Sequence, residues 1–169
     1  MINNWNVVNN RNALNQVSDY AVEADLNFMV FFVVTREWHL DWLEEVEENY
    51  GDKFLGAYLY DEPGGRQIDT GVWFSTTGNI SHPEYADRYA RILDNASDYG
   101  EASELFMHSV SSYYMQDLKE REIPIFTSDY GLYWFDYQAG YDMVFAQLGW
   151  GHNTTKHIAL CRGGSECSK

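Results

Sequence analysis

Two adjacent carboxylates, Asp61 and Glu62, follow an apolar run and precede Pro-Gly-Gly. A pair of carboxylates flanking one bond is the arrangement that cleaves glycosidic linkages. Glu62 is our candidate general acid, with Asp129 or Asp61 as the base or nucleophile. Because strand side chains alternate in direction, Asp61 and Glu62 face one side only if the strand has already ended. We therefore expect Glu62 to face the site and Asp61 to bond nearby backbone. The competing interpretation is a plain polar turn.

Apolar runs predict the strands that would position these residues. The run at 54–59 contains one glycine, which permits close backbone approach, and the Pro-Gly-Gly turn ends it. Similar runs predict strands at 28–34, 123–128 and 143–148. Helical spacing predicts helices between and around them, at 12–24, 35–50, 83–97, 101–121, 132–138 and 155–162. Residues 1–10 are expected to form a loop, and Gly163-Gly164 is expected to end the last helix.

This alternation predicts an α/β fold with a parallel sheet and crossover helices. No repeat, linker or change in composition divides residues 1–169, which predicts one domain. A complete eight-stranded barrel needs about 250 residues. An open α/β sheet and a partial barrel both fit the pattern. We favour a partial (β/α) TIM-barrel-like domain of about four parallel strands, because nothing follows the fourth strand and its helix.

Polar and aromatic side chains gather at the predicted strand ends. Ligand sites of parallel α/β folds lie at the carboxyl ends of strands. These residues are therefore the candidate substrate-binding set: Arg36, Tyr60, Tyr130, Trp134, Gln147 and Trp150.

Composition narrows the class of ligand. Aromatic residues make up 17% of the chain, more than a core of this size requires, and surplus rings suit the apolar faces of sugars. The formal net charge of −15 disfavours nucleic acid as a partner. No stretch has the apolar length of a membrane span. The five histidines form no i, i+4 pair and no phosphate loop occurs, so we expect neither a metal nor a cofactor.

Signals for cellular location are mixed. The first residues lack the basic and apolar regions of a signal peptide. Three N-glycosylation sequons, at Asn79, Asn95 and Asn153, point instead toward an extracellular or cell-surface protein.

The segment Tyr58-Leu59-Tyr60-Asp61-Glu62-Pro63 resembles the Tyr-x-x-Asp-Glu-Pro strand-end signature of glycoside-hydrolase-like (β/α)8 barrel proteins. Residues 126–130 and 145–150 resemble the following strands, so the similarity covers about two thirds of the chain. The resemblance implies a carbohydrate ligand and Glu62 as the acid/base residue. Gln147 departs from the pattern, because it stands where a retaining enzyme would carry a carboxylate.

Three functions fit these observations. The first is a glycosidase-like hydrolase. The second is a non-catalytic carbohydrate-binding or cell-surface module, or a fragment of a larger secreted protein. The third is a partial domain that self-associates, since open sheet edges invite pairing.

Overall fold

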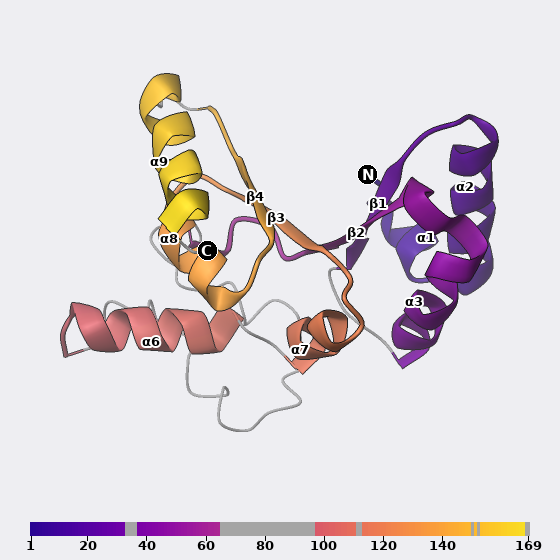
Figure 1. Ribbon diagram of the computed structural model, residues 1–169, viewed down its shortest axis with the longest axis horizontal. Helices are drawn as coiled ribbons and strands as arrows, with labels where there is room; N and C mark the ends of the chain where they lie inside the picture. The colour runs from indigo at the N-terminus through magenta and orange to yellow at the C-terminus, as the bar shows by residue number, and fades with distance from the viewer. Residues whose placement is uncertain (33–36, 65–96, 111–112, 150, 152, 168–169) are drawn as a thin grey trace. The chain divides into compact units, whose positions relative to one another are not determined.

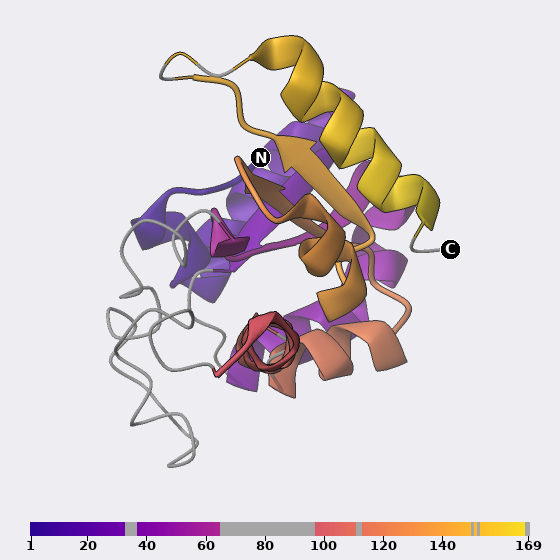
Figure 2. The same cartoon turned by 90° about the vertical axis from the view of Figure 1, so that its left-hand side faces the viewer.

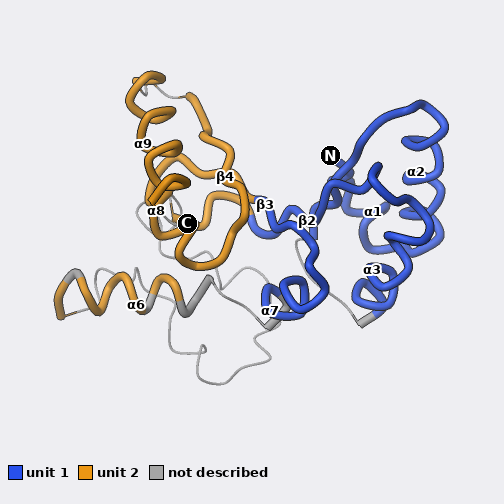
Figure 3. Tube along the Cα trace, in the orientation of Figure 1, with its two compact units in different colours: residues 1–60, 114–126 blue, residues 61–113, 127–169 orange. Residues whose placement is uncertain are grey.

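The computed structural model describes residues 1–32, 37–64, 97–110, 113–149, 151 and 153–167 (Figure 1). The chain forms two compact units (Figure 3). Unit 1 contains residues 1–60 and 114–126, and unit 2 contains residues 61–113 and 127–169. The chain passes between the units after Tyr60, Tyr113 and Phe126, so neither unit is a contiguous stretch of sequence. Each unit is described by itself below.

The predicted α/β fold is confirmed. Four parallel strands form one sheet in the order β1-β2-β3-β4. Their bounds are β1 Phe28–Phe32, β2 Phe54–Leu59, β3 Ile125–Asp129 and β4 Met143–Ala146. Strand order therefore follows chain order, as it does in (β/α) barrels, whereas doubly wound sheets reverse direction at a switch point. This order is compatible with a partial barrel.

A glycine permits β2 and β3 to approach closely in unit 1. Gly56 has a φ of 140°, and a Cβ there would lie 2.2 Å from the carbonyl oxygen of Pro124. The next residue, Ala57, donates its N–H to that same oxygen at 2.9 Å. A side chain at position 56 would thus collide with the strand that β2 pairs with, which confirms the predicted reason for glycine in this strand.

The prediction of a loop at 1–10 is wrong. Residues Trp5–Val8 form helix α1, which Asn4 caps by accepting the N–H of Asn6. Ile2 adds to the sheet beside β1, where it donates to Met29 and accepts from Phe31. Asparagine caps and the burial of Val8 against unit 1 explain how an Asn-rich stretch acquires structure. The edge of β1 away from β2 is therefore partly occupied.

The other helices of unit 1 pack against its strands. They are α2 Arg11–Glu23, α3 Glu37–Tyr50, the 3-10 turn Gly51–Lys53, and α7 Tyr113–Glu120 apart from its first residue. The core contains Trp42, Phe32 and Leu14, which are all fully buried. The ring of Phe32 also packs on His39, whose Nε2 lies 2.8 Å from the carbonyl oxygen of Val8. This contact gives the Nε2 atom of the buried histidine a hydrogen-bond partner in the core.

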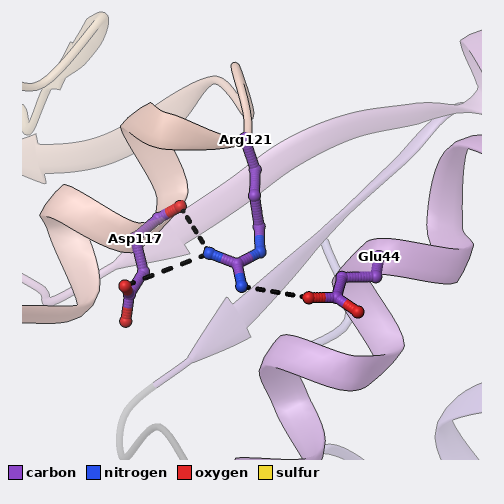
Figure 4. Close-up of polar contacts among 3 residues, drawn as sticks. All are labelled: Glu44, Asp117 and Arg121. Atoms are coloured by element: carbon purple, nitrogen blue, oxygen red, sulfur yellow. Dashed lines mark hydrogen bonds and ion pairs between the residues drawn. The ribbon is translucent and has the colours of Figure 1, made fainter.

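Arg121 links α7 to α3 within unit 1 (Figure 4). One guanidinium nitrogen donates to the carboxylate of Glu44 at 3.1 Å. The other donates to the carbonyl oxygen of Asp117 at 3.0 Å, so it also closes the end of α7. The side chain of Arg121 is 27% exposed, and the pair is therefore partly shielded from solvent.

Unit 2 contains α6 Tyr99–Val110, α8 Tyr133–Ala139 and α9 Thr154–Cys167. Helix α9 packs on α8 and β4, as both views of the chain show (Figures 1 and 2). Its first turn is capped by Asn153, which accepts the N–H of Lys156 at 3.0 Å, and the helix begins one residue before the predicted start. Of the helix predicted at 101–121, the structure describes α6 and α7, and residues 111–112 lie outside the described residues. The predicted helix at 83–97 lies almost wholly outside them.

The predicted end of the last helix at Gly163-Gly164 is wrong. Helix α9 continues to Cys167. Gly164 is buried, and a Cβ there would lie 3.1 Å from the ring of Tyr137 and 3.3 Å from the backbone nitrogen of Trp134. Close packing of α9 on α8 thus overrides the low helical propensity of the two glycines.

Candidate functional site

A sharp turn follows β2 and carries the Asp-Glu pair. Tyr60 and Glu62 both have left-handed backbone, with φ of 61° and 56°. This conformation costs a residue with a side chain about 1–2 kcal/mol, and such residues gather at functional sites. Asp61 lies between these two residues. The direction of its side chain is therefore set by this turn, and contacts around the turn must stabilise its backbone.

Three polar side chains from successive strand ends meet in unit 2. Ser128, at the end of β3, donates its hydroxyl hydrogen to Oδ1 of Asp61 at 2.9 Å. Gln147 follows β4, and its Nε2 donates to the hydroxyl oxygen of Ser128 at 3.4 Å. All three residues are half-buried. We call Asp61, Ser128 and Gln147 the polar triad.

The sequence predicted that Glu62 faces the site and that Asp61 bonds nearby backbone. Asp61 accepts a hydrogen bond from the side chain of Ser128, 67 residues away. The backbone N–H of Glu62 donates to the carbonyl oxygen of Ser128 at 2.9 Å. Glu62 is half-buried. Its role as general acid stays a prediction.

Asp129 ties the turn after β2 to the turn after β3. It is fully buried, and its Oδ2 accepts the N–H of Gly64 at 2.5 Å. Its Oδ1 accepts the N–H groups of Tyr130 at 2.7 Å and Gly131 at 3.1 Å. The backbone carbonyl of Asp129 also accepts the N–H of Gln147 at 2.7 Å. Three N–H bonds to one carboxyl group favour its charged form.

This enclosure favours an anchoring role for Asp129. A carboxylate with no exposed surface and both oxygens bonded to backbone is out of reach of a sugar bound outside the protein. The role of base or nucleophile was predicted for Asp129 or Asp61. Of the two, the described geometry favours Asp61.

A second buried carboxyl group, Asp136 of α8, lies beside Asp129. Asp136 is fully buried, and neither of its oxygens receives a hydrogen bond from an N–H or O–H group. Burial and the neighbouring charge of Asp129 raise the pKa of Asp136 to about 10. Asp136 therefore keeps its proton at neutral pH.

Other titratable groups surround this pair in unit 2. Burial and the nearby Cys161, Asp129 and Asp136 raise the pKa of Tyr133 to about 12. The phenol of Tyr133 thus keeps its proton, and its oxygen lies 2.9 Å from Nδ1 of His157. Burial likewise raises the pKa of the Cys161 thiol, which donates to the carbonyl oxygen of Val144 at 3.1 Å. A protonated, buried thiol is a poor nucleophile.

The remaining candidates are placed as follows. Tyr60 and Tyr130 are half-buried, and Trp134 on α8 is 39% exposed. Arg36 and Trp150 lie outside the described residues. Within the described ranges, no three His, Cys, Asp or Glu side chains gather where they could hold a metal ion. No described helix has both the length and the apolar character that crossing a membrane requires.

Sequence reasoning missed Gly64 and Asp136. A Cβ on Gly64 would lie 2.6 Å from Cβ of Leu132 and 2.8 Å from Oδ2 of Asp129, so only glycine fits between the two turns. The signal for Asp136 was its place as the one charged residue in Tyr-Trp-Phe-Asp-Tyr. A carboxylate among aromatic residues of a short helix is a candidate for burial.

Comparison with known proteins finds no match to the chain among protein-family models, curated proteins or solved structures.

Proposed function

We propose that unit 2 carries a carbohydrate-binding site of the glycoside-hydrolase type. The observation that supports this most is the polar triad, in which an acceptor, a hydroxyl and an amide from three successive strand ends lie in hydrogen-bonding distance of one another. Carboxylates, hydroxyls and amides on one rim match the hydroxyl pattern of a sugar. Tyr130 and Trp134 supply aromatic surface in the same unit.

In the hydrolase form of this proposal, Glu62 donates a proton to the glycosidic oxygen. Asp61 then acts as base or nucleophile. The hydroxyl of Ser128 donates to Oδ1 of Asp61 and so helps to orient the carboxylate for either role. Whether the configuration is retained or inverted depends on the separation of the two carboxyl groups in the complex with substrate.

A screen of oligosaccharides with the wild type, Glu62→Gln and Asp61→Asn tests the hydrolase. We expect the wild type to hydrolyse at least one glycan. Glu62→Gln should bind that glycan with similar affinity and turn it over at least about 100-fold more slowly, as expected for loss of a general acid. Glu104→Gln on α6 is the matched control, because Glu104 is exposed. Equal turnover by wild type and Glu62→Gln would reject the assignment.

A non-catalytic carbohydrate-binding module is the second candidate. Gln147 favours it, because an amide at the end of the fourth strand cannot serve as a nucleophile, and Asp129 is enclosed. The same screen separates the two. Glycan binding without turnover in the wild type, weakened by Ser128→Ala, supports the module.

A further inference from the structure

We propose that Asp136 is a positioning residue: its protonated carboxyl donates a hydrogen bond to Asp129 and thereby holds the two turns that carry the site. The relevance to ligand binding rests on the function proposed above. The proton arrangement itself does not depend on that function.

The first step concerns where the proton lies. Asp136 and Asp129 are both fully buried, no N–H or O–H group of the described residues donates to either oxygen of Asp136, and the charged group beside it is the carboxyl of Asp129. Two ionised carboxylates cannot hydrogen-bond to each other, and two buried like charges repel strongly. One proton between them removes both problems, as in other carboxyl pairs that share a proton.

The second step decides which residue carries that proton. Asp129 accepts backbone N–H groups from Gly64, Tyr130 and Gly131. No N–H or O–H group of the described residues donates to either oxygen of Asp136. The proton therefore resides on Asp136, which is the donor, and the charge resides on Asp129.

The third step follows the consequence toward the site. Asp129 bonds backbone from both turns: Gly64 belongs to the turn after β2, and Tyr130 and Gly131 to the turn after β3. Ser128 and Gln147 flank the same residue, since Gln147 bonds the carbonyl oxygen of Asp129. Fixing the orientation of Asp129 thus fixes the strand ends that bring Asp61, Ser128 and Gln147 together.

Burial and the charge of Asp129 on β3 oppose ionisation of Asp136. The titratable groups on the neighbouring helices are Tyr133 and Tyr137 of α8, and Cys161 and His157 of α9, with Nδ1 of His157 2.9 Å from the oxygen of Tyr133. Burial and neighbouring groups raise the pKa values of both tyrosines and the thiol. These three groups therefore stay protonated and uncharged. Among the described side chains of α6 and β4, none supplies a cation to this cluster.

The direct test needs no substitution. Carbon-13 carboxyl NMR of the wild-type chain reports the protonation of each aspartate during a pH titration. We expect the Asp136 carboxyl to stay protonated at neutral pH while that of Asp129 is ionised. Ionisation of Asp136 at neutral pH, or protonation of Asp129 in its place, would overturn the proposal.

Two variants test the positioning. Asp136→Asn keeps a donor that does not titrate, and Asp136→Leu keeps the volume without a donor. Amide hydrogen exchange of Gly64, Tyr130 and Gly131 is the readout, and it is independent of any ligand. We expect Asp136→Asn to retain wild-type protection. Asp136→Leu should exchange about tenfold faster at these amides, as expected for one weakened buried hydrogen bond. Equal protection in both variants would overturn the positioning role.

Glycan binding by the same variants separates the two proposals. Absence of glycan binding in the wild type would reject the proposed function and leave the exchange result intact. Unchanged exchange in Asp136→Leu, with glycan binding present in the wild type, would reject the role of Asp136 and leave the proposed function intact.

Discussion

The backbone N–H of Gly64 donates to Oδ2 of Asp129, a residue 65 positions further along the chain, at 2.5 Å. This bond joins the turn after β2 to the turn after β3 at the point where Asp-Glu-Pro-Gly ends. The carboxylate of Asp129 comes so near that the glycine has no room for a side chain. Local sequence, close packing and the candidate site are thus linked through one pair of residues.

Gly64→Ala should destabilise the protein by roughly 1–3 kcal/mol, because its Cβ would collide with Leu132, Asp129 and the backbone of Gly131. Urea unfolding measures the change. Gly163→Ala is the matched control, because a Cβ there meets nothing within 4 Å and the position lies inside α9. That control should stabilise by up to about 1 kcal/mol through helical propensity. Similar effects of the two substitutions would contradict the packing described for Gly64.

Asp136 should make stability fall as pH rises. The pKa of its carboxyl is about 10 in the folded chain against an ordinary 3.8, so between these values the folded state holds one proton more than the unfolded state. The contribution of this proton is fully present below pH 3.8 and lost as pH rises toward 10, by roughly 1.4 kcal/mol per pH unit.

Asp136→Asn removes this dependence, because an amide does not titrate. Relative to wild type, the variant should therefore become more stable with increasing pH. Urea unfolding of both proteins at several pH values between about 5 and 8 measures the difference. Asp52→Asn, at an exposed position, serves as the control. A constant difference between Asp136→Asn and wild type over this range would refute the prediction.

Ser128→Ala should weaken ligand binding more than it weakens the fold. The substitution removes the hydroxyl that donates to Asp61 and accepts from Gln147, so both side chains lose their orientation. We expect a loss of about 1 kcal/mol in binding free energy, or roughly fivefold in Kd, measured by calorimetry with the glycan identified in the screen. Ser103→Ala on α6 is the control, because its hydroxyl donates to the local backbone carbonyl of Gly100 at 3.0 Å. Equal Kd for Ser128→Ala and wild type would exclude a role for the triad in binding.

The pair of Arg121 and Glu44 should contribute modestly to the stability of unit 1. A double-mutant cycle with Arg121→Met and Glu44→Gln should give a coupling energy of about 0.2–1 kcal/mol, since Glu44 is largely exposed. The coupling should shrink as salt concentration increases. Arg121→Met alone should cost more than the coupling, because it also removes the bond to the carbonyl oxygen of Asp117. A coupling energy that is unaffected by molar salt would contradict this account.

The sequence by itself determined the α/β class and most strand positions. Apolar runs such as 54–59 must be buried, and their alternation with helical spacing leaves a parallel sheet as the natural arrangement. The Asp-Glu-Pro-Gly-Gly segment identified where β2 ends, because Pro and Gly interrupt a strand through local backbone restrictions alone. Residue types at the strand ends also identified Asp61 and Gln147 as candidate site residues.

Only the tertiary structure decided which of these groups meet and what state they are in. The bond from Ser128 to Asp61 joins residues 67 positions apart, and Asp136 on α8 is fully buried beside the charge of Asp129 on β3. Helix α9 continues through Gly163 and Gly164, and Gly164 packs closely on Tyr137 and Trp134 of α8. Periodicity and propensity act within a few residues, whereas desolvation, proton sharing and close packing depend on neighbours that the fold brings together.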